Sequence, residues 1–379
     1  MSFPRYPKYK PSGVEWLGDV PEHWETWKLA HAFALIGSGT TPKTDKLDYY
    51  DGGEIPWVNT GDLNDGELED CGKRVTQKAI ADHTSLRIYP AGSLLIAMYG
   101  ATIGKLAMLR FPATVNQACC VFSGTSPIVS MFMFYWFLGL RQQILSLATG
   151  GGQPNVSQDI LRTLRVACPD HAEQTAIAAF LDRETGKIDE LVAEQRRLIE
   201  LLKEKRQAVI SHAVTKGLNP HAPTKPSGIE WLGDVPEHWT VAAVRFRYTV
   251  QLGKMLDTEK ITGQHLQPYL RVFDVQWGEI NVEDLPQMDF DPSIRDRFRL
   301  TPGDLLINEG GSYPGRSAIW KGELEECYFQ KALHRLRPCN TTTDTTRFFF
   351  YIMAWATALG VFTAGGNQRD RKSVCRERV

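Results

Sequence analysis

The glycine-rich stretch at residues 100–105, GATIGK, is the segment of this sequence that comes nearest to a catalytic motif. A phosphate-binding loop needs two glycines separated by four residues, followed by Lys and then by Ser or Thr, whose hydroxyl binds Mg²⁺. Here the spacing between the glycines is one residue short, and Leu106 occupies the hydroxyl position. Nucleotide binding is therefore not expected.

A cluster of carboxylates, Glu67, Glu69 and Asp70, could be imagined as a nuclease metal site. It follows the turn-forming residues 64–66, so a solvated hairpin turn explains it better. The seven Cys form no CxxC pair and the nine His have no metal-ligand spacing, which predicts no metal and reduced thiols. The sequence also has no Asn/Asp-Pro-Pro-Tyr motif for a flipped adenine and no FxGxG loop for S-adenosylmethionine. We expect neither bond chemistry nor a cofactor in this chain.

The elements that would position binding residues are written twice. Residues 10–24, KPSGVEWLGDVPEHW, recur at 225–239 with a single change, from Val14 to Ile229. We call these two stretches the twin segments. Residues 91–109 and 302–320 match in the same way: each is a turn, a β-rich run and a glycine loop that ends in a basic residue. Such repetition predicts two copies of one domain.

Each half continues with an aromatic segment, at 131–140 and 348–359, whose density of apolar residues predicts a buried helix. Each segment leads to a glycine turn, at 149–153 and 364–368. Short strands are predicted at 55–59, 93–98 and 304–308, without a regular alternation of strands and helices. The predicted fold class is therefore α+β, a mixed α/β domain present twice.

Between the copies, residues 172–216 contain no Pro, and Gly186 is the single Gly, so a long helix is predicted. Its heptad seam, the a and d positions of a coiled coil, consists of Ile188, Leu191, Gln195, Leu198, Leu202, Lys205 and Val209. Thirty such residues span about 45 Å, which would keep two domains apart. The alternative is a helix packed on its own domain, which the polar seam residues Gln195 and Lys205 disfavour.

These features resemble the specificity (S) subunits of type I restriction-modification systems. The resemblance runs from about residue 11 to residue 368 and is carried by the twin segments and by residues 49–63, 100–105, 153–181, 297–312 and 327–338. It implies two tandem target-recognition domains joined by a long coiled-coil spacer helix. The domains would be a first recognition domain at 10–169, the spacer at 170–217, an incomplete second recognition domain at 218–368 and an atypical tail at 369–379.

The tail departs from the family pattern. A second spacer helix should follow Gln368, but the chain reads RDRKSVCRERV and stops. We expect a truncated or misassembled reading frame. The antiparallel pair of spacer helices that the family forms could then not form within this chain, and the seam would lie exposed.

The resemblance further implies a non-catalytic subunit that recognises a bipartite target in double-stranded DNA and positions methyltransferase (M) and restriction/translocase (R) subunits on it. S-adenosylmethionine, ATP and Mg²⁺ would be held by those partners. A net charge of −1 means that the partners must supply much of the charge that neutralises phosphates. The apolar stretch at 128–140 is too short to span a membrane, and a cytoplasmic location is expected.

Base reading needs amide and basic side chains on loops. The candidates are Lys43, Asn59, Thr60, Tyr99, Lys105, Arg271, Asn308, Tyr313 and Arg316, and each could instead be a structural loop residue. Because Lys105 and Arg316 share an aligned position, they could equally serve a common structural or phosphate-binding role. The tryptophans of the twin segments, Trp16, Trp24, Trp231 and Trp239, are candidates for docking a partner or for the core.

Two other functions compete with this one. A coiled-coil adaptor or scaffold without a DNA role would explain the repeat and the helix equally well. A fused enzyme that both recognises and modifies DNA is disfavoured by the missing catalytic motifs.

Overall fold

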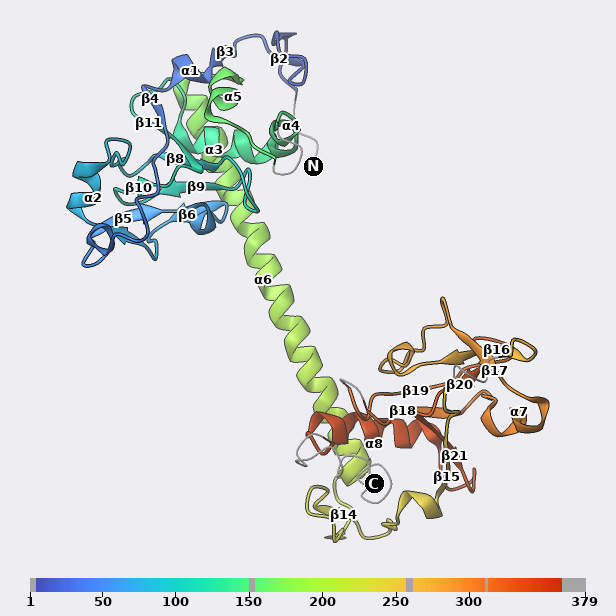
Figure 1. Cartoon of the computed structure of the whole chain (residues 1–379). Helices are drawn as coiled ribbons and strands as arrows, with labels where there is room; N and C mark the ends of the chain where they lie inside the picture. The colour runs from blue at the N-terminus through green and yellow to red at the C-terminus, as the bar shows by residue number, and fades with distance from the viewer. Residues whose placement is uncertain (1–4, 150–153, 257–261, 311–312, 363–379) are drawn as a thin grey trace. The chain divides into compact units, whose positions relative to one another are not determined.

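The computed structural model describes residues 5–149, 154–256, 262–310 and 313–362 (Figure 1). The chain forms two compact units, Met1–Ala193 and Glu194–Val379. The helix α6 (His171–Lys216) begins in the first unit and ends in the second. The predicted glycine turns at 149–153 and 364–368 fall outside the described residues, apart from Thr149, and so does the tail at 369–379.

The first unit contains two main sheets. The larger has the order β4-β11-β8-β9-β6, in which β6 and β9 are parallel and the other pairs antiparallel. The smaller has the order β10-β5-β7, in which β5 and β10 are parallel. The strands are β4 (Leu35–Gly37), β5 (Ile55–Val58), β6 (Gly66–Leu68), β7 (Arg74–Val75), β8 (Leu94–Ala97), β9 (Leu106–Leu109), β10 (Thr114–Val115) and β11 (Cys119–Ser123).

Two short antiparallel pairs and several helices complete the first unit. The pairs are β1 (Tyr9–Pro11) with β2 (Asp19–Pro21), and β3 (Glu25–Lys28) with β12 (Arg165–Cys168). The α-helices are α1 (Leu29–Ala32), α2 (Gln77–Asp82), α3 (Ser130–Gly139), α4 (Arg141–Ser146) and α5 (Gln158–Thr163), and the 3-10 turns are η1 (Leu47–Tyr49) and η2 (Thr60–Asp62).

The second unit repeats this plan. Its sheets have the orders β15-β21-β18-β19 and β17-β16-β20, and β16 and β20 are parallel. The strands are β13 (Thr224–Pro226), β14 (Asp234–Pro236), β15 (Tyr248–Leu252), β16 (Leu266–Leu270), β17 (Gln287–Asp289), β18 (Leu305–Asn308), β19 (Ser317–Ile319), β20 (Tyr328–Phe329) and β21 (Leu333–Pro338). The helices are α7 (Pro292–Phe298) and α8 (Thr346–Ala358), with 3-10 turns η3 (Val244–Phe246) and η5 (Val272–Asp274).

The strand orders of the two units correspond except for β6, which has no counterpart among the described strands of the second unit. In the larger sheets β4-β11-β8-β9 matches β15-β21-β18-β19, and in the smaller ones β10-β5-β7 matches β20-β16-β17. The prediction of one α+β domain present twice is confirmed. The three predicted strands are also confirmed as β5, β8 and β18.

The two aromatic segments are helices, as predicted. Helix α3 packs on β8 and β9, and α8 packs on β18, β19 and β21. Phe132 and Phe137 of α3 and Phe349 and Trp355 of α8 are buried in the hydrophobic core of their own unit. No helix within the described ranges combines the length and apolar character needed to cross a membrane.

Helix α6 is continuous over 46 residues, and its middle is solvated. Every residue from 188 to 206 is exposed. Among the apolar seam residues the exposed fraction runs from 45% at Leu198 to 60% at Ile188 and Val209. Only the ends of the helix enter a core, with Ile177 packed in the first unit and Ile210 and Val214 in the second. The seam is therefore not covered by either unit, unlike in the alternative of a helix packed on its own domain.

The contact that fixes the smaller sheets is a close approach of backbone at Gly39 and Gly253. A Cβ atom at Gly39 would overlap the carbonyl oxygen of Val115, and one at Gly253 would overlap that of Gln330. We expect Gly39→Ala to lower the free energy of unfolding of the first unit by about 2 kcal/mol or more, because the backbone itself must shift. Urea unfolding followed by circular dichroism measures this change.

Gly61→Ala is the matched control, since a Cβ at Gly61 meets no atom within 4 Å. Equal stabilities of the two variants would contradict the close approach at Gly39.

Candidate nucleic-acid interface

The two glycine loops that the sequence aligns adopt the same turn. The N–H of Gly104 donates to the carbonyl of Ala97 (2.8 Å), and the N–H of Gly315 donates to that of Asn308 (2.9 Å). Both glycines have a positive φ, +77° and +84°, which side chains disfavour. The sequence alignment of these loops therefore holds in three dimensions.

The basic residue after each loop is Lys105 or Arg316, and the two have different surroundings. Nη1 of Arg316 donates to Oε1 of Gln276 (2.6 Å), and the guanidinium lies 3.8 Å from the centre of the Tyr313 ring. Lys105 is half-buried at the equivalent position. A cation on an aromatic ring is held in place without being neutralised. Arg316 therefore keeps a charge that can pair with a phosphate.

Asn59 and Arg271 occupy equivalent positions, which the sequence did not reveal. Each precedes a 3-10 turn, and its backbone N–H donates to the acidic residue that ends the turn, Asp62 Oδ2 at 2.8 Å or Asp274 Oδ2 at 2.7 Å. Each also directly follows a strand that has a parallel neighbour, β5 or β16. One scaffold thus carries an amide in the first unit and a guanidinium in the second.

Both side chains at this position already make contacts within the protein. Arg271 donates from Nε and Nη2 to the carboxylate of Asp274, both at 2.9 Å, and its guanidinium lies 4.1 Å from the centre of the Phe273 ring. This ion pair raises the pKa of Arg271 and leaves Nη1 outside it. In the first unit, Nδ2 of Asn59 donates to the carbonyl of Trp57 (3.0 Å). A base contact by Asn59 or Arg271 would use the polar groups of the side chain that lie outside these bonds. The bonds themselves would hold the side chain in one orientation.

Asn308 differs from its predicted role. It is 1% exposed, and its Nδ2 donates to the carbonyl of Val272 (2.9 Å). This bond ties the end of β18 to η5. The structure gives Asn308 a positioning role in place of the predicted base contact, because a buried amide cannot reach a base edge.

The other candidates lie on the same loops or beside them. Lys43 is exposed in the loop after β4, Thr60 opens η2, and Tyr313 is 58% exposed. Tyr99 instead forms a bridge with Asn155 and packs against the first core. Base or phosphate contacts by these residues stay predictions.

In the second unit the structure brings two predicted groups together. The bond between Gln276 and Arg316 and that between Asn308 and Val272 join the segment 271–278 to the β18–β19 hairpin. Sequence reasoning missed the exposed aromatics of this segment, Phe273 (62% exposed) and Trp277 (39%). The sequence signal for these exposed aromatics is the mixture of aromatic and polar residues at 271–277. It indicates exposure only once η5 is known to turn the chain there.

The groups that could do bond chemistry are engaged in structural contacts. Glu67 pairs with Arg110, and Asp70 accepts from Arg74 (2.8 Å) and from the N–H of Cys71, bonds that lower the pKa of Asp70. Glu67 lies in strand β6 (Gly66–Leu68), which pairs in parallel with β9, so the predicted hairpin turn is wrong for Glu67. Burial raises the pKa of the thiols of Cys119 and Cys327 to about 12 and that of Cys168 to about 11.

Such thiols stay protonated at neutral pH and are poor nucleophiles. Among the described residues, no group of three or more His, Cys, Asp or Glu side chains could hold a metal ion.

The tryptophans of the twin segments pack on the aromatic helix of their own unit. Trp16 lies 5.7 Å from Trp136 and Trp231 lies 5.5 Å from Trp355, measured between ring centres. Trp24 meets Phe132 at 6.3 Å, and Trp239 meets Phe348 at 5.9 Å. All four are half-buried. Trp16, Trp24 and Trp231 pack against the core of their unit, whereas Trp239 contacts the exposed Phe348. Docking of a partner on their exposed edges stays a prediction.

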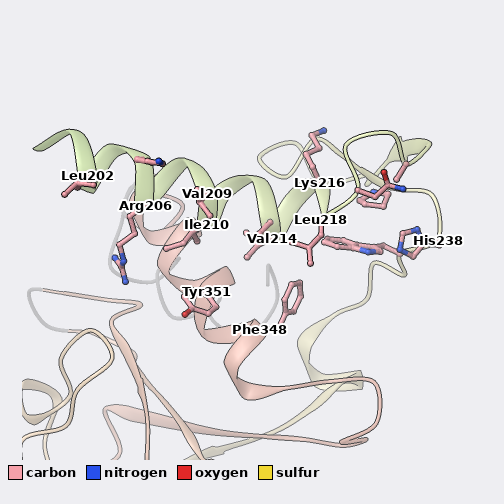
Figure 2. A pocket seen from close by; sticks show the side chains of 17 residues that line it. Leu202, Arg206, Val209, Ile210, Val214, Lys216, Leu218, His238, Phe348 and Tyr351 are labelled. Atoms are coloured by element: carbon pink, nitrogen blue, oxygen red, sulfur yellow. The ribbon is translucent and has the colours of Figure 1, made fainter. Parts of the chain in front are cut away.

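An apolar pocket lies in the second unit between the end of α6 and α8 (Figure 2). Its cavity volume is about 1010 Å³, and Ile210 and Val214 from α6 face Phe348 and Tyr351 from α8 across it. Trp239 also lines it. Since this lining is mainly apolar, the pocket suits apolar side chains better than a polar substrate.

The corresponding aromatic pair of the first unit is covered. The Tyr6 ring lies 6.3 Å from that of Trp24, and the Tyr6 hydroxyl donates to Oε1 of Glu173 (2.6 Å) in the first turn of α6. The twin segments therefore have equal folds and unequal surroundings.

Comparison with known proteins finds similarity to DNA specificity subunits of type I restriction enzymes. Residues 21–201 match the family model of the type I restriction modification DNA specificity domain. The chain is 28% identical over 191 residues to the type I restriction enzyme MjaIX specificity subunit of Methanocaldococcus jannaschii, covering 49% of this chain and 42% of that protein. It is 24% identical over 298 residues to the EcoKI specificity subunit of Escherichia coli, covering 76% and 62%. The chain thus spans less than two thirds of the length of either relative.

Solved structures share the fold. The crystal structure of the HsdS subunit from Thermoanaerobacter tengcongensis aligns with a TM-score of 0.58 at 16% identity, covering 90% of this chain and 81% of that one. A chain from a study of complex assembly and conformational transition of the type I R-M system aligns with a TM-score of 0.61 at 16% identity, covering 88% and 80%. These likenesses confirm the architecture of two tandem domains joined by a long helix.

The aligned cations lead to a test that does not depend on the target sequence. We expect Lys105→Glu and Arg316→Glu each to weaken binding to every duplex on the order of tenfold, and to reduce the salt dependence of the affinity by about 0.9 for each lost phosphate contact. Fluorescence anisotropy with mixed-sequence duplexes over a salt series measures both quantities.

Lys321→Glu, at an exposed lysine just beyond β19, is the charge-matched control. An affinity and a salt slope equal to those of the control would exclude both cations from the interface.

Proposed function

We propose that the chain is a specificity subunit of a type I restriction-modification system and that it reads a two-part sequence in double-stranded DNA. Each unit would contact one half of the target, and the chain would hold methyltransferase and restriction/translocase subunits there without bond chemistry of its own. The observation that carries this proposal is the duplicated scaffold, two units whose strand orders correspond apart from β6, joined by one continuous helix.

The duplicated scaffold suits reading because its equivalent positions differ in chemistry. Asn59 and Arg271 follow equivalent strands, β5 and β16, and make equivalent backbone bonds, yet one carries an amide and the other a guanidinium. Amides pair well with adenine edges and guanidinium groups with guanine edges in the major groove. Two units built in this way would prefer different half-sites.

Helix α6 would set the gap between the half-sites. Each helical residue adds about 1.5 Å, so a continuous helix acts as a spacer of fixed length. The exposed seam from Ile188 to Val209 suits pairing with another helix, which would stiffen the spacer.

The charge of the chain indicates a role for partner subunits in binding. With a net charge of −1 the chain has little surplus charge to neutralise a phosphate backbone. The M subunits would supply much of the positive surface around the duplex. S-adenosylmethionine, ATP and Mg²⁺ would be bound by the partners, with no cofactor in this chain, and the complex would act in the cytoplasm.

A coiled-coil adaptor without a DNA role is the second candidate. The exposed seam favours it, since solvated apolar residues at heptad spacing suit a partner helix whatever the units bind. The two functions differ in whether the chain prefers any DNA sequence.

Selection from a randomised duplex library separates these functions. We expect the full chain, supplied with the M subunits of its own locus, to enrich a motif of two short half-sites at a fixed gap, because two reading units are joined by one helix. Sequencing of the bound fraction measures the motif. The M subunits alone are the control, and a full complex that enriches no motif would favour the adaptor.

A further inference from the structure

The carboxyl ends of the parallel strand pairs β5–β10 and β16–β20 have the same backbone arrangement. In the first pair the N–H of Asn116 donates to the carbonyl of Val58 (3.0 Å). In the second the N–H of Gln330 donates to the carbonyl of Leu270 (3.1 Å). Asn116 and Gln330 are therefore equivalent, and so are the residues that follow them, Gln117 and Lys331.

A third segment reaches the same place in each unit. The N–H of Gly39 donates to the carbonyl of Asn116 (3.2 Å), and the N–H of Lys331 donates to the carbonyl of Lys254 (2.9 Å), which follows Gly253. As the close approach at both glycines shows, the segments touch backbone to backbone. In both units three segments therefore meet beside a glycine, although different backbone atoms bind the third segment in each.

The side chains at this place differ although the same strand ends meet there. The exposed positions carry Thr41 and Gln117 in the first unit, and Met255 (62% exposed) and Lys331 in the second. Thr41 Oγ1 donates to Gln117 Oε1 (2.6 Å), which orients the amide and leaves its Nε2 outside this bond. An oriented Gln and an exposed Lys have the chemistry to contact different base edges.

Comparing the residue types at equivalent positions of the two units distinguishes positions suited to phosphate contact from positions suited to base reading. Lys105 and Arg316 are equivalent and both cationic, as expected of residues that contact phosphates, which are the same in every sequence. Gln117 and Lys331 are equivalent and differ in charge and in hydrogen-bonding groups, as expected of residues that read sequence. Because backbone hydrogen bonds of the preceding residues, Asn116 and Gln330, tie this turn to the neighbouring strand, a side chain here can change without removing those bonds.

We propose that Gln117 and Lys331 are equivalent specificity-determining residues, each contacting base edges in the half-site bound by its own unit. This inference rests on the proposed function, in which each unit contacts one half of a split target. Neither residue was identified from sequence, since a polar residue beside a short strand is ordinarily just solvated.

The test is selection from a randomised duplex library by the full chain with its M subunits, comparing wild type, Gln117→Ala and Lys331→Ala. We expect Gln117→Ala to relax base preference in one half-site and Lys331→Ala in the other, with about a tenfold loss of discrimination at the affected base pair. Lys331→Gln should change the preferred base in its half-site and retain a preference there.

Gln77→Ala in α2 and Lys321→Ala beyond β19 are matched controls at exposed positions outside the carboxyl ends of the parallel pairs β5–β10 and β16–β20. Both should leave the whole motif unchanged, and thermal melting should show that every variant folds like wild type.

Two results would overturn the inference while the proposed function stands. One is a wild-type motif that Gln117→Ala and Lys331→Ala leave unaltered. The other is a uniform weakening across all sequences with a reduced salt slope, which would make these residues phosphate contacts. If the wild-type complex enriches no motif, the proposed function itself fails.

Discussion

At Gly39 and Gly253 one backbone segment lies so close to another that a single methyl group would overlap a carbonyl oxygen. This contact holds the loop after β4 in the first unit, and after β15 in the second, against the end of a parallel strand pair. A 3-10 turn follows β5 in the first unit and β16 in the second, and it is part of the same arrangement. The backbone N–H before each turn donates to Asp62 or Asp274. Because the arrangement is made by backbone atoms, a similar one can recur in two units whose exposed side chains differ.

Much of the architecture could be predicted from the sequence. The twin segments and glycine loops identified the repeat, and the aromatic density predicted α3 and α8 as buried helices. What covers the outer side of these helices was not predictable. Trp16 and Trp24 are more than a hundred residues from the α3 residues that they contact, and spacing along the chain does not report such packing.

The candidate site was predicted less well, for two physical reasons. First, loops of unequal length change the register between the copies, so the equivalence of Asn59 with Arg271 and of Gln117 with Lys331 becomes visible only through shared backbone bonds. Second, the type of a residue does not reveal its burial. Asn308 has the chemistry of a base reader, but its amide is enclosed beside η5 and serves to hold that turn in place.

The exposure of Gln117 and Lys331 has a consequence for evolution. Surface substitutions away from cores, caps and strained backbone usually change stability by less than about 0.5 kcal/mol. Mutations at these two positions can therefore accumulate without a folding cost that selection would remove. The two units can also diverge independently, since each has its own core. New combinations of base preferences in the two half-sites can then arise through separate single substitutions while the protein stays folded.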